Sequence, residues 1–190
     1  MSADPKFDLE YLAVGLEELE RYLLSGELFW PLMERPSSGG SFLKLTVGNL
    51  LFSLKRLEAL DAAQKLSRSE IAEWEKSARA LDAVRRKWQV AWQEKAAREY
   101  RSRFRQWGNV LRDIKKDFEK QAAYYSHEVR LRVLLDLLQP EAGEIEGYEL
   151  EALDAFLKGI LTQGGFIWEV ELARGFPEDQ YWYLYGELLE

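Results

Sequence analysis

Hydrophobic positions in the middle of the chain recur at helical spacing over an unusual length. Residues 49–139 contain no proline and a single glycine, Gly108. Apolar or small side chains return every three or four residues from Ile71 to Val133. This is the spacing of one face of an α-helix and not of a strand. The pattern therefore predicts one long helix over residues 67–138.

The two ends of this helix are marked by residues that start and stop helices. Ser67 and Glu70 fit a capping box, in which each side chain binds a backbone N–H of the first turn. Pro140 excludes helical backbone from the residue before it. Gly108 and Asn109 would also suit a helix end and a new start, which makes a helical hairpin. The stripe keeps its phase there and an interior glycine costs only about 1 kcal/mol, so a continuous or bent helix is favoured and the hairpin stays open.

The expected length of this helix has a consequence for assembly. Roughly 70 residues at 1.5 Å each span about 100 Å, whereas a compact domain of this size is roughly 40 Å across. A continuous helix would overhang its domain, and its apolar stripe would need a partner. We therefore expect self-association in the manner of a coiled coil, as a homodimer. The candidate interaction surface is the set of large aromatic side chains on the stripe, Trp88, Trp92, Tyr100, Phe104 and Trp107.

Shorter periodic patterns on both sides predict further helices. Leucines at helical spacing predict a helix over residues 7–25. Thr46 fits the N-cap of a second helix that runs to about residue 64. A short helix is expected over 148–161, and Pro177 with the acidic residues after it is typical of the start of a last helix.

Two stretches that follow glycine pairs, 42–46 and 166–172, alternate in the manner of strands. They leave open a short two-stranded β-ribbon, which is marginal unless it packs on helices. The expected fold is mainly α, a helical bundle built on one very long, straight or kinked central helix. It forms one domain over residues 1–190, in three parts: N-terminal helices (1–65), the central helix (67–138) and an acidic aromatic C-terminal segment (141–190).

Charge is distributed unevenly along the chain. The net charge is −7, but residues 68–132 hold 17 Lys and Arg against 10 Asp and Glu, which leaves 9 against 23 elsewhere. No apolar stretch is long enough to span a membrane, and the first residues lack the basic and apolar regions of a signal peptide. The absence of cysteine excludes disulfides and thiolate metal sites. We expect a cytoplasmic protein with no membrane association.

No motif for catalysis, metal binding or nucleotide binding stands out. His127 is the only histidine, which excludes zinc sites with two or more histidines. Ser126 and His127 are neighbours on the predicted helix and point about 100° apart, so they do not pair as nucleophile and base. The glycine pairs lack the strand–loop–helix context of a phosphate-binding loop. We expect no cofactor and no enzymatic activity, and favour a helical scaffold that binds other proteins.

The basic stretch 79–105 supports one alternative function, binding of nucleic acid. Its arginines would neutralise phosphates, and the interleaved aromatic residues would stack on bases. The candidate contacts are Arg85, Arg86, Arg98, Arg101 and Arg105. The aromatic residues fall on the apolar stripe, however, and the charge wraps around the helix. Pairing of these arginines with the acidic end segments, in the same chain or in a partner, is the favoured interpretation.

Overall fold

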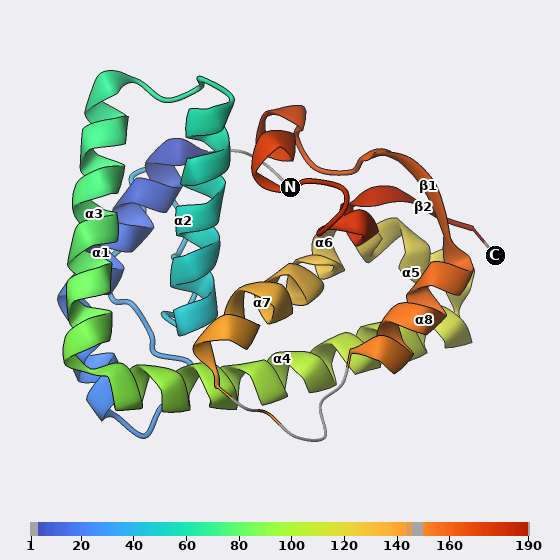
Figure 1. Ribbon diagram of the computed structural model, residues 1–190, viewed down its shortest axis with the longest axis horizontal. Coiled ribbons are helices and arrows are strands. Elements are labelled where there is room, and N and C mark those ends of the chain that lie inside the picture. Colours follow the sequence, from blue (N-terminus) through green and yellow to red (C-terminus); the bar gives the residue numbers. More distant parts are fainter. Residues whose placement is uncertain (1–3, 144, 146–149, 190) are drawn as a thin grey trace.

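The computed structural model describes residues 4–143, 145 and 150–189 and is mainly helical, with one small antiparallel sheet (Figure 1). The α-helices are α1 (Pro5–Leu24), α2 (Val47–Ala62), α3 (Arg68–Lys87), α4 (Gln89–Lys116), α5 (Phe118–Gln121), α6 (Tyr125–Glu128), α7 (Arg130–Leu138) and α8 (Glu151–Ile160). The 3-10 turns are η1 (Ala122–Tyr124), η2 (Gln139–Glu141), η3 (Val170–Gly175) and η4 (Trp182–Leu184), and the strands are β1 (Leu161–Phe166) and β2 (Tyr185–Leu188).

The helices form two groups that α4 joins. In Figure 1, α1, α2 and α3 lie together at one end, and α4 runs from the foot of α3 along the base of the molecule. The chain then reverses, and α7 returns along α4 and packs against α2 as well. The C-terminal segment places the sheet at the other end and reaches back to α2, on which η3 packs (Figure 1). The mainly α-helical fold expected from the sequence is confirmed.

The single long helix predicted over residues 67–138 is wrong. Trp88 leaves helical geometry, with φ −116° and ψ 38°, and separates α3 from α4. Asp117, with φ −146° and ψ 75°, ends α4, which at 28 residues is the longest described helix. The chain reverses after Asp117 and not at Gly108, which lies inside α4. The hairpin alternative therefore placed the reversal at the wrong residue.

The bend at Trp88 lets two helices cover one core. Trp88 closes one helix and opens the next: its N–H donates to the Val84 carbonyl at 2.9 Å, and its own carbonyl accepts the Trp92 N–H at 2.9 Å. α3 packs on α1, whereas α4 packs on α7. A straight helix would reach only one of these partners. The apolar stripe keeps its phase because each piece turns the same side toward the shared core.

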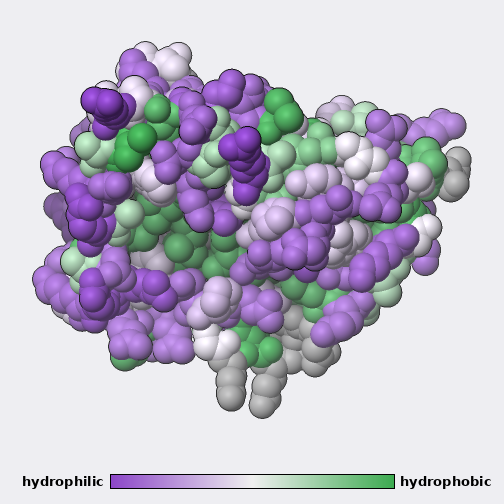
Figure 2. All heavy atoms as spheres, turned by 45° about the horizontal axis from the view of Figure 1, so that its top comes forward, coloured by the Kyte–Doolittle hydropathy of each residue, from purple (hydrophilic) through white to green (hydrophobic). Residues whose placement is uncertain are grey.

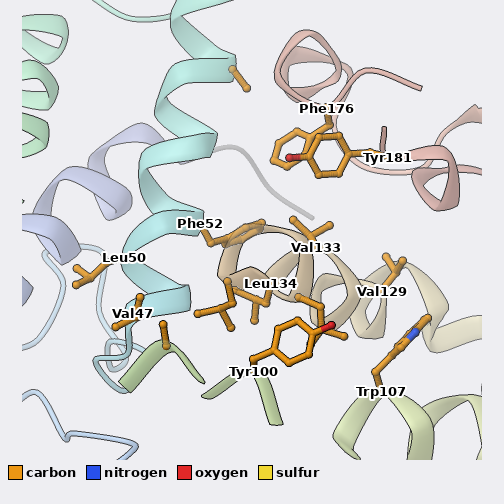
Figure 3. Packing of buried hydrophobic residues seen from close by; sticks show 14 of the residues in the cluster. Val47, Leu50, Phe52, Tyr100, Trp107, Val129, Val133, Leu134, Phe176 and Tyr181 are labelled. Atoms are coloured by element: carbon orange, nitrogen blue, oxygen red, sulfur yellow. The ribbon is translucent and has the colours of Figure 1, made fainter. Parts of the chain in front are cut away.

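The core lies where α2, α4, α7 and the C-terminal segment meet. Figure 3 shows the large side chains that fill it: Val47, Leu50 and Phe52 from α2, Tyr100 and Trp107 from α4, Val129, Val133 and Leu134 from around α7, and Phe176 and Tyr181 from the C-terminal segment. Figure 2 shows a mostly hydrophilic face, with hydrophobic residues at the bottom of a hollow left of centre. The aromatic side chains of the stripe thus pack mostly against other parts of the same chain.

The C-terminal segment departs from the predicted order of elements. The strand predicted at 166–172 is wrong, because the sheet pairs β1 with β2, Leu161 opposite Leu188. The predicted last helix after Pro177 is replaced by η4 and β2. Aromatic side chains here, such as Phe176, fill the core, and residues of this kind favour extended backbone. The ribbon partner expected at 42–46 forms only an isolated bridge, between Leu45 and Trp30.

Candidate binding groove

A groove with an apolar floor and a basic rim runs between α4 and α8. Its volume is about 570 Å³. Gly108 lies within α4 at this groove, and a Cβ atom added to it would have no neighbour nearer than Leu153 Cδ2 at 4.0 Å. The groove residues are Phe104, Arg105, Gly108, Asn109, Leu111, Arg112 and Lys115 from α4, and Leu153 and Phe156 from α8.

The cations on the rim have no acidic partner in the described part of the chain. No carboxylate lies within 4.0 Å of the charged nitrogens of Arg105, Arg112 or Lys115 among these residues. Arg112 Nη1 donates to the side-chain amide oxygen of Asn109, at 3.0 Å. All three side chains are exposed. The rim therefore presents positive charge that the described residues do not neutralise.

A buried ion pair fixes α8 on the rest of the molecule. Arg132 on α7 binds both carboxylate oxygens of Asp154 on α8, at 2.9 Å each, and also binds Asp136. The hydroxyl of Tyr183 donates to Asp136 at 2.6 Å. Burial alone would lower the pKa of Arg132, but its hydrogen bonds with Asp154 and the charge of Asp136 hold the pKa above the ordinary value. Asp154 is therefore bound by Arg132 and does not neutralise the rim.

The aromatic residues predicted as an interaction surface lie mostly inside the chain. Trp92, Tyr100 and Trp107 are 2%, 3% and 0% exposed. Trp92 Nε1 also donates to Glu141 at 2.7 Å. Trp88 sits at the bend, and Phe104 is partly buried at the groove. The stripe thus needs no partner, and the reason for expecting a homodimer through it is gone.

The five arginines predicted to contact nucleic acid have separate surroundings. Arg85 pairs with Glu141 at 3.0 Å, Arg86 pairs with Asp82, and Arg98 donates to the Gly26 carbonyl at 2.9 Å. Arg105 lies on the rim of the groove. For Arg101 no carboxylate lies within 4.0 Å among the described residues. The structure therefore does not gather these five side chains into one basic surface.

Several charged residues with a structural role were not singled out from the sequence. Lys95 Nζ donates to the carbonyls of Ser25 and Glu27 just beyond α1, at 3.0 Å for Ser25. Glu99 is fully buried, accepts the Gly48 N–H at 2.8 Å and pairs with Arg103 at 3.1 Å. Their only sequence signal is the spacing of four between the last pair.

The approach of Glu99 to Gly48 requires a glycine. A Cβ atom at residue 48 would lie 2.9 Å from Glu99 Oε1. The groove cations Arg112 and Lys115 lie outside the basic stretch 79–105, and no sequence pattern links them with Phe156 of α8. Their closeness to one another depends on how α8 packs, which no local pattern encodes.

Catalytic and metal chemistry find no support at the groove. Among residues 4–143, 145 and 150–189, no group of three or more His, Cys, Asp or Glu side chains is arranged to hold a metal ion. His127 is exposed and lies away from the groove, beside a separate cavity. Within the same residues, no helix combines the length and apolar content needed to cross a bilayer. No protein-family model, curated protein or solved structure matches this chain.

Proposed function

We propose that the protein is a non-enzymatic interaction protein whose α4–α8 groove binds an apolar segment with acidic flanks from a partner protein. The observation that carries this proposal is the apolar floor beneath three cations that lack carboxylate partners among the described residues. Burial of the floor would supply affinity, at about 25 cal/mol per Å² of apolar area. The cations would set orientation and partner choice.

The spacing of the cations specifies the partner further. Arg105 and Arg112 are seven residues apart on α4, which corresponds to about 10 Å along the helix axis. Lys115 follows three residues later on the same side of the helix. A helical partner therefore needs carboxylates about two turns apart beside its apolar face, in the manner of a helix laid in a groove.

Self-association remains a proposal, but through the groove and not through the aromatic stripe. The aromatic stripe is buried, so a dimer would use this groove, with a second copy supplying the acidic apolar segment. Nucleic acid is the competing occupant, because Arg101 and Arg105 also lack carboxylate partners among the described residues. We favour a protein segment because the floor of the groove is apolar, so that burial of apolar side chains, which a phosphate backbone lacks, would contribute to binding.

A titration with defined probes tests the proposal. The probes are a fluorescein-labelled helical peptide with a leucine face and glutamates two turns apart, the same peptide with glutamine for glutamate, and single-stranded oligo-dT. We expect the glutamate peptide to bind at about 50 mM salt, and the glutamine peptide to bind at least about tenfold more weakly. Arg105→Glu with Arg112→Glu should abolish binding, whereas Arg79→Glu, an exposed change on α3, should not.

Three results would contradict the proposal. One is failure of the glutamate peptide to bind, and another is equal binding by the charge-reversed variant. The third is tight, salt-dependent binding of oligo-dT alone, which would assign the cations to phosphates. The molar mass in solution, measured by light scattering, tests whether a second copy of the chain occupies the groove. A mass of twice 22.2 kDa that Arg105→Glu with Arg112→Glu halves would identify a second copy as the occupant.

A further inference from the structure

A second cavity, separate from the groove, lies between the start of α2, the middle of α4 and the start of α7. Its volume is about 310 Å³. On α4 it is lined by Arg103 and Gln106, which point to a different side of the helix from Arg105 and Arg112. The remaining lining residues are Phe29, Leu43, Lys44, Asn49, His127, Glu128, Arg130, Leu131 and Leu134.

Arg130 is the unusual residue of this cavity. Its Nη2 donates to the Asn49 side-chain oxygen, and its guanidinium lies 5.3 Å from the centre of the Phe52 ring. Its Nε is buried and has no hydrogen-bond partner. Among the described residues no carboxylate lies within 4.0 Å of it. Within the described part of the chain, this mostly buried guanidinium thus has no carboxylate in direct contact.

The neighbouring buried charges already have partners. Arg56 pairs with Asp8 at 3.2 Å, and Arg103 pairs with Glu99. Burial lowers the pKa of Arg130 to about 10, and the nearby charges of Arg103 and Arg56 act in the same direction, whereas the charge of Glu99 raises it in part. A buried charge without a partner is strongly unfavourable. Among the described residues, Arg130 is therefore the buried cation of this cluster that has no direct ion pair, because Glu99, whose charge also acts on it, is paired with Arg103.

We infer that this cavity binds the oxyanion group of a small ligand, a phosphate or a carboxylate, through Arg130. A guanidinium offers planar, paired donors that match such a group, and it remains charged when buried. Lys44 lies on the same cavity and adds a second cation. Phe29, Leu43 and Leu131 would contact an apolar body. Glu128 also lines the cavity and disfavours ligands of high negative charge.

Thermal unfolding with and without added anions tests this site. The probes are sodium phosphate and sodium benzoate, with sodium chloride at equal ionic strength as the reference. An anion with a Kd of about 1 mM, added at about 10 mM, should raise Tm by about 3–6 °C. A response to phosphate alone identifies a phosphate site, and a response to benzoate alone identifies a carboxylate site. General salt effects on stability appear equally in every variant.

Three variants locate the response. Arg130→Met should abolish the shift, Lys44→Met should reduce it, and Arg112→Met in the separate groove should leave it intact. If Arg130→Met does not fold, Arg130→Lys replaces it and should weaken the shift, because an ammonium lacks the paired donors. The inference is overturned if neither anion exceeds chloride, or if the Arg130 variant responds as the native protein does.

Discussion

The two halves of α4, residues 89–103 and 104–116, contain similar numbers of Lys and Arg side chains, but these side chains make different contacts. In the first half, Lys95 and Arg98 donate to carbonyls of residues 25–27, and Glu99 with Arg103 forms a buried pair. In the second half, Arg105, Arg112 and Lys115 have no carboxylate partner among the described residues. The difference arises because the end of α1 and the loop after it lie against the first half, whereas α8 brings apolar side chains to the second.

This comparison shows that local charge composition does not identify a binding surface. The basic stretch 79–105 looks uniform in sequence, yet Arg85 and Arg98 are taken up by contacts within the chain. The cations that remain exposed are partly outside that stretch. What lies opposite each side chain decides whether its charge stabilises the fold or faces solvent.

The largest expected effect is at the buried carboxylate of the first half. Glu99→Ala should lower the free energy of unfolding by about 3–5 kcal/mol, because it leaves Arg103 and the Gly48 N–H without their buried partner. Urea unfolding measures this change. Glu94→Ala, at an exposed position one turn earlier, should stay within about 0.5 kcal/mol. A loss below about 1 kcal/mol for Glu99→Ala would show that the two halves do not differ in this way.

The next effect concerns the link between α4 and the end of α1. Lys95→Met keeps the length of the side chain but removes the donor to the carbonyls of Ser25 and Glu27. We expect a loss of about 1.5–3 kcal/mol in the free energy of unfolding. Lys115→Met, in the second half, should change stability by no more than about 0.5 kcal/mol. Equal losses for the two lysines would contradict the comparison.

The free energy of unfolding should depend on pH through the buried carboxyl group of Asp8. Burial raises the pKa of Asp8 to about 6 in spite of Arg56. Between pH 3.8 and about 6, the folded protein holds a proton on Asp8 that the unfolded chain has released. Binding of this proton therefore stabilises the folded state; the stabilisation is fully present below pH 3.8 and is lost as the pH rises through about 6. From pH 7 to pH 4.5, urea unfolding should show the native protein gaining about 2 kcal/mol relative to Asp8→Asn. No difference between them would mean that Asp8 titrates normally.

The smallest effect should occur at the groove and with opposite sign. Gly108→Ala should raise the free energy of unfolding by about 0.5–1 kcal/mol, because alanine favours helix and its Cβ has room there. The expected gain matches that of Gly159→Ala in α8, where no atom lies within 4 Å of an added Cβ. Gly108→Leu should fill the groove and block the glutamate peptide. Destabilisation by Gly108→Ala would mean that the groove floor is closed.

Local chemistry predicted the starts of α2 and α3 correctly, whereas the helix start predicted at Pro177 is wrong. The Ser67–Glu70 capping box is present, and Thr46 caps α2 through the Asn49 N–H at 3.1 Å. These contacts involve residues three apart, so the sequence contains both partners. The groove was not predictable in the same way, since Leu153 and Arg112 are brought together only by the packing of α8 on α4.

The sequence by itself predicted most of the helical stretches, the starts of α2 and α3 and the buried side of these helices, because these depend on neighbours within about four residues. Only the tertiary structure decided that the helical stretch bends at Trp88 and reverses after Asp117. Hydrophobic periodicity indicates which side of a helix is buried, but it does not indicate whether the helix axis is straight. Packing on two separate partners, α1 and α7, made the bends favourable, and the same packing settled which charges are buried and which surround the groove.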